Sequence, residues 1–150
     1  RCPLTVVQSQ NPFDKGIPTI FSSLLNIYVI GEDTPLNITF GNFPVIPPCA
    51  GIPSEWTVVN DQPEGPAVKI GAPQNAENGR FKIQKGIRFG YKLVFCPVPE
   101  GTCGDIGIHI DHQGNRRLVL GDEQYYPLLV MFEKVGLPLA QNNLVLPRSQ

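Results

Sequence analysis

The chain has 150 residues, of which 41% are hydrophobic, and its formal net charge is −1 with an isoelectric point near 6.1. This length and apolar content suffice for a core, so we expect one domain over residues 1–150. A nearly neutral chain has little electrostatic attraction for nucleic acid or for an anionic membrane, and no apolar run is long enough to cross a bilayer. We therefore expect neither nucleic acid nor a membrane as a partner.

Glycine and proline divide the chain into short segments that are rich in Val, Ile, Leu, Phe, Thr and Tyr. The sequence contains 15 glycines and 16 prolines, and no window keeps helical spacing through a capped run. This pattern is typical of an all-β domain. The expected strands are residues 4–8, 19–22, 26–30, 36–40, 56–60, 67–70, 81–85, 91–95, 106–111, 117–120 and 128–134.

Three connecting segments have the residue types of tight turns. Residues 62–65, 77–79 and 111–115 place Gly or Asn where a positive φ is expected. We predict that each closes a hairpin.

A weak internal repeat relates two parts of the chain. The segments 67–70 and 81–85 resemble the later segments 117–120 and 130–134. A repeat built from strands suggests a β array with internal symmetry, and closure into a barrel would remove its open edges. Residues 136–150 lack the second half of a hairpin, so we expect an irregular tail there.

Four cysteines allow three pairings, and their spacing favours Cys2 with Cys49 and Cys96 with Cys103. Disulfides indicate an oxidising compartment, such as the secretory pathway, the vacuole or the cell exterior. The triplet Asn37-Ile38-Thr39 is a candidate N-glycosylation site, which agrees with that route.

The few candidate catalytic or metal-ligating residues do not form a recognisable site. His109 and Asp111 alternate along an expected strand and His112 lies in the following turn, so we expect structural roles for them. Ser22 and Ser23 lack the context of a nucleophile elbow. We therefore expect no enzyme activity, no metal and no cofactor.

Several longer segments carry a family resemblance. They are Cys2-Pro-Leu-Thr-Val-Val7, Ser54-Glu-Trp-Thr-Val-Val59, Gly65-Pro-Ala-Val-Lys-Ile-Gly71, Tyr91-Lys-Leu-Val-Phe-Cys-Pro97, Cys103-Gly-Asp-Ile-Gly-Ile108 and Gly114-Asn-Arg-Arg-Leu-Val119. In this order they resemble the legume Kunitz-type inhibitors, the soybean trypsin inhibitor family. The resemblance implies a β-trefoil with pseudo-threefold symmetry, the same two disulfides, and a secreted or vacuolar protein of plant seeds.

The resemblance also implies that the first trefoil unit is incomplete. Members of the family carry a further N-terminal segment, and the present sequence begins after it. We therefore expect the unit to lack its first strands, which would leave an open barrel edge. We expect the segment to exist as a separate chain or outside this sequence.

By the same resemblance, the chain binds a serine protease through an exposed loop. The loop residues are Leu24, Leu25, Asn26, Ile27 and Tyr28. A loop that already has the extended shape of a substrate loses little conformational entropy on binding. Asn26 falls before the scissile bond, where trypsin inhibitors carry Arg or Lys, so we expect weak trypsin inhibition.

The residues also allow two other interpretations, one of the loop and one of the function. Residues 24–28 could form one more core strand with an internal Asn. The chain could also be a seed storage, defence or carbohydrate-binding β-trefoil that has lost inhibition. A vacuolar asparaginyl peptidase is a further candidate target, because its specificity pocket would accept the amide of Asn26.

Overall fold

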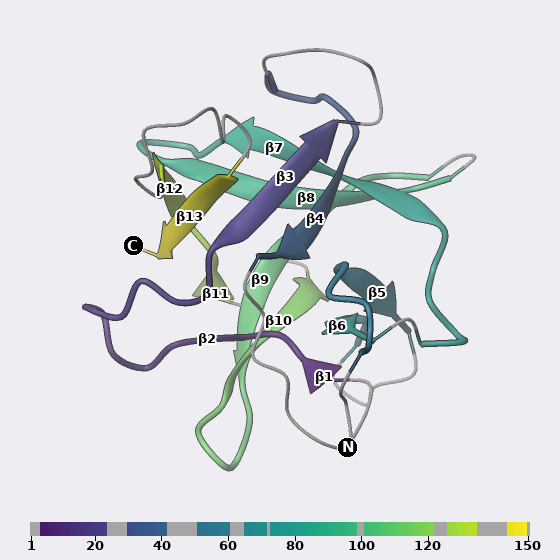
Figure 1. Cartoon of the computed structure of the whole chain (residues 1–150), viewed down its shortest axis with the longest axis horizontal. Helices are drawn as coiled ribbons and strands as arrows, with labels where there is room; N and C mark the ends of the chain where they lie inside the picture. The colour runs from purple at the N-terminus through teal and green to yellow at the C-terminus, as the bar shows by residue number, and fades with distance from the viewer. Residues whose placement is uncertain are drawn as a thin grey trace.

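The structure is a computed structural model that describes residues 4–23, 30–41, 51–60, 65–71, 73–98, 101–121, 126–134 and 144–149. For residues 126, 127 and 144–149 only the backbone is described. Every regular element within these ranges is a β-strand, so the all-β prediction is confirmed (Figure 1).

The described strands all belong to one curled sheet. They are β1 (Leu4–Thr5), β2 (Val7–Gln8), β3 (Thr19–Ser23), β4 (Leu36–Phe40), β5 (Thr57–Val59), β6 (Ala67–Ile70), β7 (Gly79–Lys85), β8 (Tyr91–Pro97), β9 (Gly104–Ile110), β10 (Arg116–Gly121), β11 (Tyr126–Pro127), β12 (Val130–Lys134) and β13 (Leu144–Ser149). The bounds of most strands agree with those of the expected segments to within a few residues. The expected strand 26–30 lies outside the described residues except for Ile30, which is not in a strand.

The first expected strand is divided at Val6 because the chain changes partners there. β1 pairs with β6, whereas β2 pairs with β10. The Val6 N–H donates to the Val68 carbonyl (3.0 Å), and the Val6 carbonyl accepts from the Leu118 N–H (3.1 Å). The Val6 side chain is buried, so this change of partner fixes the N-terminal strand against the core.

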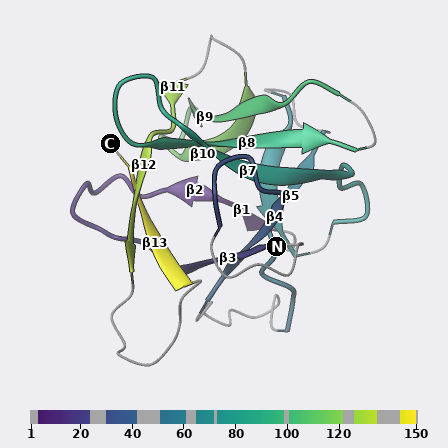
Figure 2. The same ribbon diagram turned by 90° about the horizontal axis from the view of Figure 1, so that it is seen from above.

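A closed ring of antiparallel strands forms the barrel. Its order is β8, β12, β13, β3, β4, β7 and back to β8. The remaining strands extend from β8 through β9 to β10 and β6, and Figure 2 shows them from above. Closure satisfies backbone hydrogen-bonding groups that an open sheet would expose.

The expectation of an irregular tail is wrong for Leu144–Ser149. These residues form β13, which lies between β12 and β3 in Figure 1. The register runs from Val130↔Ser149 to Lys134↔Val145 on one side and includes Leu144↔Ile20 on the other. The tail therefore supplies the second half of a hairpin with β12, and it joins β12 to β3 in the sheet.

Strand alternation builds the core. Leu36 and Ile38 of β4 have no solvent-exposed surface, whereas Asn37 and Thr39, which alternate with them, are partly exposed. Trp56 packs edge-on against Phe40 and Phe81, with ring centroids 5.5 and 6.3 Å away. Burial of such side chains contributes about 1.5–3 kcal/mol each, so the interior is the main source of stability.

Two of the three turn predictions are confirmed. β9 and β10 form a hairpin across residues 111–115, and β5 pairs with β6 across the 62–65 segment, of which only Gly65 is described. The Asp111 carboxylate accepts the N–H of Asn115 and that of Gln113, both at 2.9 Å. These bonds, chiefly the one from Asn115, lower the pKa of Asp111.

The third turn prediction, for residues 77–79, is wrong. β7 follows this segment but pairs with β8 and β4 rather than with the preceding β6. The Asn78 carbonyl accepts instead from the N–H of Val98, at 3.1 Å. The segment therefore connects two strand pairs and does not close a hairpin.

No helix in the described part of the chain is long and apolar enough to span a membrane.

Removing β13 tests its place in the ring. Truncation after residue 143 exposes the facing edges of β12 and β3, where β13 makes five and two register pairs. At about 0.5 kcal/mol net for each pair, the lower end of the usual range for a hydrogen bond, we expect a loss on the order of 3 kcal/mol. For a domain of this size that lowers Tm by about 6–12 °C. Thermal unfolding measures the change, with removal of Gln150 alone as the control. An unchanged Tm would show that the barrel does not depend on β13.

Candidate protease-binding site

The expected protease-binding loop lies between β3 and β4. These strands pair from Thr19↔Phe40 to Ser23↔Leu36, so the chain leaves and re-enters the sheet at neighbouring positions. The loop residues Leu24, Leu25, Asn26, Ile27 and Tyr28 lie outside the described residues. The structure thus defines the base of the loop and its return segment, residues 30–35.

Three hydrogen bonds attach the return segment to β7. The Asp33 N–H donates to the Ile83 carbonyl (3.0 Å), and the Asp33 carboxylate accepts from the Gln84 side-chain amide (2.7 Å). The Glu32 carboxylate accepts from the Lys85 N–H (2.9 Å). Backbone and side-chain contacts together therefore hold this limb against a second strand pair of the barrel.

Asp33 adopts the left-handed backbone conformation, with φ of 61°. Asp and Asn tolerate this region better than most residues with a side chain. The turn that contains Asp33 closes through the Thr34 N–H, which donates to the Gly31 carbonyl at 3.4 Å. Glu32 and Asp33 were not predicted as positioning residues, because an acidic pair in a polar turn gives no local signal of the strand that it will contact.

Buried side chains anchor the two strands that flank the loop base. Phe21 of β3 and Leu36 of β4 are almost fully buried, and Phe21 also meets Phe132 edge-on, with ring centroids 5.3 Å apart. On its other side β3 pairs with β13 at Thr19 and Ile20. The strand that leads into the loop is therefore paired on both sides near its start.

Of the two expected disulfides, one falls within the described residues. Cys96 and Cys103 are bonded at 2.05 Å and join the end of β8 to the segment before β9. Cys2 and Cys49 lie outside the described residues. The bridged hairpin adjoins β7, which pairs with β8 along its length and holds the return segment of the loop.

The remaining predicted site residues lie apart from this loop base. Asn37 is in β4, opposite Ser22, and is partly exposed on the face away from the core. His109 lies in β9 opposite Arg117, and His112 lies in the exposed turn beyond it. Among the described residues, no group of three His, Cys, Asp or Glu side chains is placed to hold a metal ion.

Residues 1–134 match the Kunitz legume family, which is described as "Trypsin and protease inhibitor". The chain belongs to this family. Its members are protease inhibitors rather than enzymes, so the predicted family membership and the predicted lack of enzymatic function are confirmed.

Two curated relatives of the family come from Glycine max. Trypsin inhibitor A is 52% identical over 157 residues, which cover 100% of this chain and 72% of the relative. Trypsin inhibitor B is 54% identical over 141 residues, which cover 90% of this chain and 77% of the relative. Matches of this extent relate the whole barrel, and not one motif, to the Kunitz legume inhibitors.

A solved structure shows the same fold. The match is to a complex of porcine pancreatic trypsin with soybean trypsin inhibitor, with a TM-score of 0.81 and 53% sequence identity. The alignment covers 91% of this chain and 78% of that chain. The soybean Kunitz inhibitors are β-trefoils, so the prediction of a β-trefoil is confirmed.

Replacement of Asp33 tests the attachment of the return segment. Asp33→Ala removes the acceptor for Gln84 and places alanine at a positive φ, so we expect a loss of about 1–2 kcal/mol in the free energy of unfolding. Asp33→Asn keeps an acceptor and tolerates the same φ, so its loss is expected to stay below about 0.5 kcal/mol. Chemical denaturation compares the two variants. Equal losses would contradict the role given to the side-chain bond and the backbone conformation.

Proposed function

We propose that this chain inhibits a trypsin-like or chymotrypsin-like serine protease in the manner of a substrate, through residues 24–28. The observation that carries the proposal is the anchored loop base: β3 and β4 hold both ends, and Glu32 and Asp33 attach the return segment to β7. The names of the relatives and the trypsin complex of a structural neighbour support the same partner class.

Rigidity is the basis of such inhibition. A loop that is held in an extended conformation before binding loses little entropy when it enters the protease cleft. A Cys2–Cys49 bridge would enclose the loop covalently. If the peptide bond after Asn26 were cut, the two ends would stay in place and the bond could form again.

Asn26 determines how well trypsin is inhibited in this proposal. The specificity pocket of trypsin has a carboxylate at its base, and a short neutral side chain leaves that charge without a cation. By analogy with unpaired buried charges, the cost is on the order of 3–5 kcal/mol. This weakens trypsin binding by roughly two to four orders of magnitude relative to an Arg variant. Leu25 and Ile27 supply apolar contacts beside Asn26 that retain part of the affinity.

The Asn26→Arg variant tests the loop and its specificity residue together. We expect its inhibition constant for trypsin to fall by at least about tenfold, because the guanidinium supplies the missing cation. Asn26→Gln is the matched control, since it lengthens the side chain without adding charge, and it is expected to gain less. An unchanged constant for Asn26→Arg would show that trypsin is bound elsewhere or not at all.

A panel of proteases separates this function from its rivals. Stoichiometric loss of serine protease activity supports an inhibitor, whereas no loss with any protease supports a storage or carbohydrate-binding protein. An asparaginyl peptidase belongs in the panel because its pocket would accept the Asn26 amide. Inhibition of that enzyme alone would redirect the proposal to a different protease class.

The two disulfides are expected to contribute unequally. On the loop-entropy model, a Cys2–Cys49 bridge contributes about 4 kcal/mol and the shorter Cys96–Cys103 bridge about 2.5 kcal/mol. Only the first would enclose the loop, so the Cys2→Ser/Cys49→Ser variant should lose more inhibition than the Cys96→Ser/Cys103→Ser variant. Inhibition constants and Tm values of the two double variants provide the comparison. Equal loss of inhibition would contradict the argument.

The same proposal places the chain in the secretory route of a plant seed cell. The Cys96–Cys103 disulfide supports an oxidising compartment, and the Asn37 side chain, the candidate glycan acceptor, is partly exposed on β4. The intact mass of unreduced material from the plant measures two features at once. It reveals a glycan at Asn37 and any separate N-terminal segment that accompanies the chain.

A further inference from the structure

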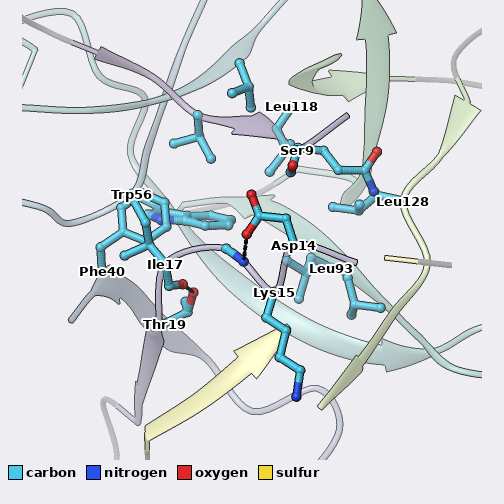
Figure 3. Close-up of a pocket in the computed structure, with 15 residues that line it drawn as sticks. Ser9, Asp14, Lys15, Ile17, Thr19, Phe40, Trp56, Leu93, Leu118 and Leu128 are labelled. Atoms are coloured by element: carbon cyan, nitrogen blue, oxygen red, sulfur yellow. Dashed lines mark hydrogen bonds between the residues drawn. The ribbon is translucent and has the colours of Figure 1, made fainter. Parts of the chain in front are cut away.

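Two hollows adjoin β2 and the residues that follow it. The first is a cavity of about 110 Å³, and in Figure 3 Trp56 lies on one side of it and Leu128 on the other. Its two charged side chains already have partners. The Asp14 carboxylate accepts a backbone N–H at 2.9 Å, and the Lys15 ammonium forms an ion pair at 2.8 Å. This cavity therefore presents no uncompensated charge to a ligand.

The second hollow is a groove of about 520 Å³ that shares Gln8 and Ser9 with the first. Its lining comes from β2 and the residues after it, from the end of β9, and from the turn that leads into β10. The Gln10 side-chain amide donates to the Gly114 carbonyl at 2.7 Å and so connects the two sides. Arg116 is the only charged side chain among the described residues of this lining.

The strand register directs three side chains into the groove. Arg116 lies directly opposite Gln8 of β2 on one side and Ile110 of β9 on the other. Side chains of directly opposed residues stand on the same face of an antiparallel sheet. All three line the groove and are at least partly exposed, so together they form its floor.

The Arg116 guanidinium has unused donors. Its Nε–H donates to the Gln8 side-chain oxygen at 2.7 Å, and the described part of the chain offers it no further hydrogen bond and no ion pair. Trp56 carries the only buried side-chain nitrogen without a partner among the described residues, so the terminal nitrogens of Arg116 are open to solvent. Asp111 of the adjoining turn does not line the groove, and its carboxylate accepts N–H groups of its own turn. The groove therefore presents an uncompensated cation.

Neutral donors and apolar surface surround this cation. The side-chain oxygen of Gln8 accepts from Arg116 and that of Gln113 accepts within its own turn, so the NH₂ groups of both amides have no partner among the described residues. Ile110 is 42% exposed, and Pro12 is also exposed in the lining. The groove thus combines one cation, free amide donors and an apolar strip.

We propose that this groove binds an acidic saccharide, a sugar whose ring carries a carboxylate, with the carboxylate on Arg116. A guanidinium and a carboxylate form charge-assisted bonds that are often bidentate. The ring hydroxyls accept from the free amides of Gln8 and Gln113, and the C–H face of the ring lies against Ile110. Pockets of about 300–1,000 Å³ are typical for small ligands, so the groove has sufficient volume. A simple carboxylate without hydroxyls would leave the amides unused.

The groove does not overlap with the proposed protease-binding loop. None of the described lining residues belongs to β3, β4 or residues 24–35. Saccharide binding and protease inhibition can thus succeed or fail independently. The test therefore measures binding and does not use inhibition as a readout.

A trimer of galacturonic acid and its methyl ester test the proposal on the full chain. The ester keeps the sugar rings and their hydroxyls but removes the charge. We expect the acid to bind at least about tenfold tighter than the ester, because only the free carboxylate pairs with Arg116. In a titration followed by ¹⁵N–¹H spectra, the backbone signals of Gln113, Gly114 and Arg116 should shift, which would locate the ligand in the groove.

Three variants separate the guanidinium from general charge. Arg116→Gln removes the cation, so the preference for the acid over the ester should disappear. Arg116→Lys keeps the charge but loses the planar fork, so we expect it to retain only part of that preference. Arg88→Gln is the matched control, because it removes the same charge from an exposed position outside the groove and should leave binding unchanged. If Arg116→Gln does not fold, the comparison of acid with ester and the location of the shifts decide the question.

Four outcomes would overturn the proposal. The first is no binding of the acid, and the second is equal affinity for the acid and the ester. The third is an equal loss in Arg88→Gln and Arg116→Gln, which would indicate non-specific attraction to the chain. The fourth is displacement of the trimer by acetate at an equal concentration, because the groove would then recognise a carboxylate without its sugar.

Discussion

The barrel depends on the backbone pairing of one six-residue strand, β13. β13 bonds to β12 on one side and to β3 on the other, and without it these two strands would expose unpaired edges to water. β3 is also the strand that leads into the proposed protease-binding loop. The geometry of the loop base therefore depends on a segment from the opposite end of the chain.

The loop base is held through successive strand pairs. Its first limb continues β3, which pairs with β4, and its return segment bonds to β7 through Glu32 and Asp33. β7 pairs along its length with β8, whose end carries the Cys96–Cys103 bridge. Antiparallel ladders transmit position well because each strand is fixed by bonds on both sides. This arrangement holds both limbs of the loop base against the barrel.

Core packing fixes Trp56 by the shape of its ring. Trp56 packs edge-on against Phe40 and Phe81, so its ring stabilises the interior, while its N–H is buried and has no partner among the described residues. Apolar packing places the ring by shape, but it does not supply an acceptor. The cavity that Thr19 lines and the chain that follows Ser23 lie at opposite ends of β3.

The sequence by itself determined the features that are encoded locally. Alternation placed Leu36 and Ile38 inward, Gly114 with φ of 85° marked the β9–β10 hairpin, and the spacing of Cys96 and Cys103 indicated their bridge. The tertiary structure alone decided the pairing of β13, the attachment of Asp33 to Gln84 and the burial of a Trp56 N–H that has no partner among the described residues. Each of these depends on groups distant in the chain. A residue pattern can specify which face of a strand is apolar, but the free edge or acceptor that a segment meets is set only when the barrel closes.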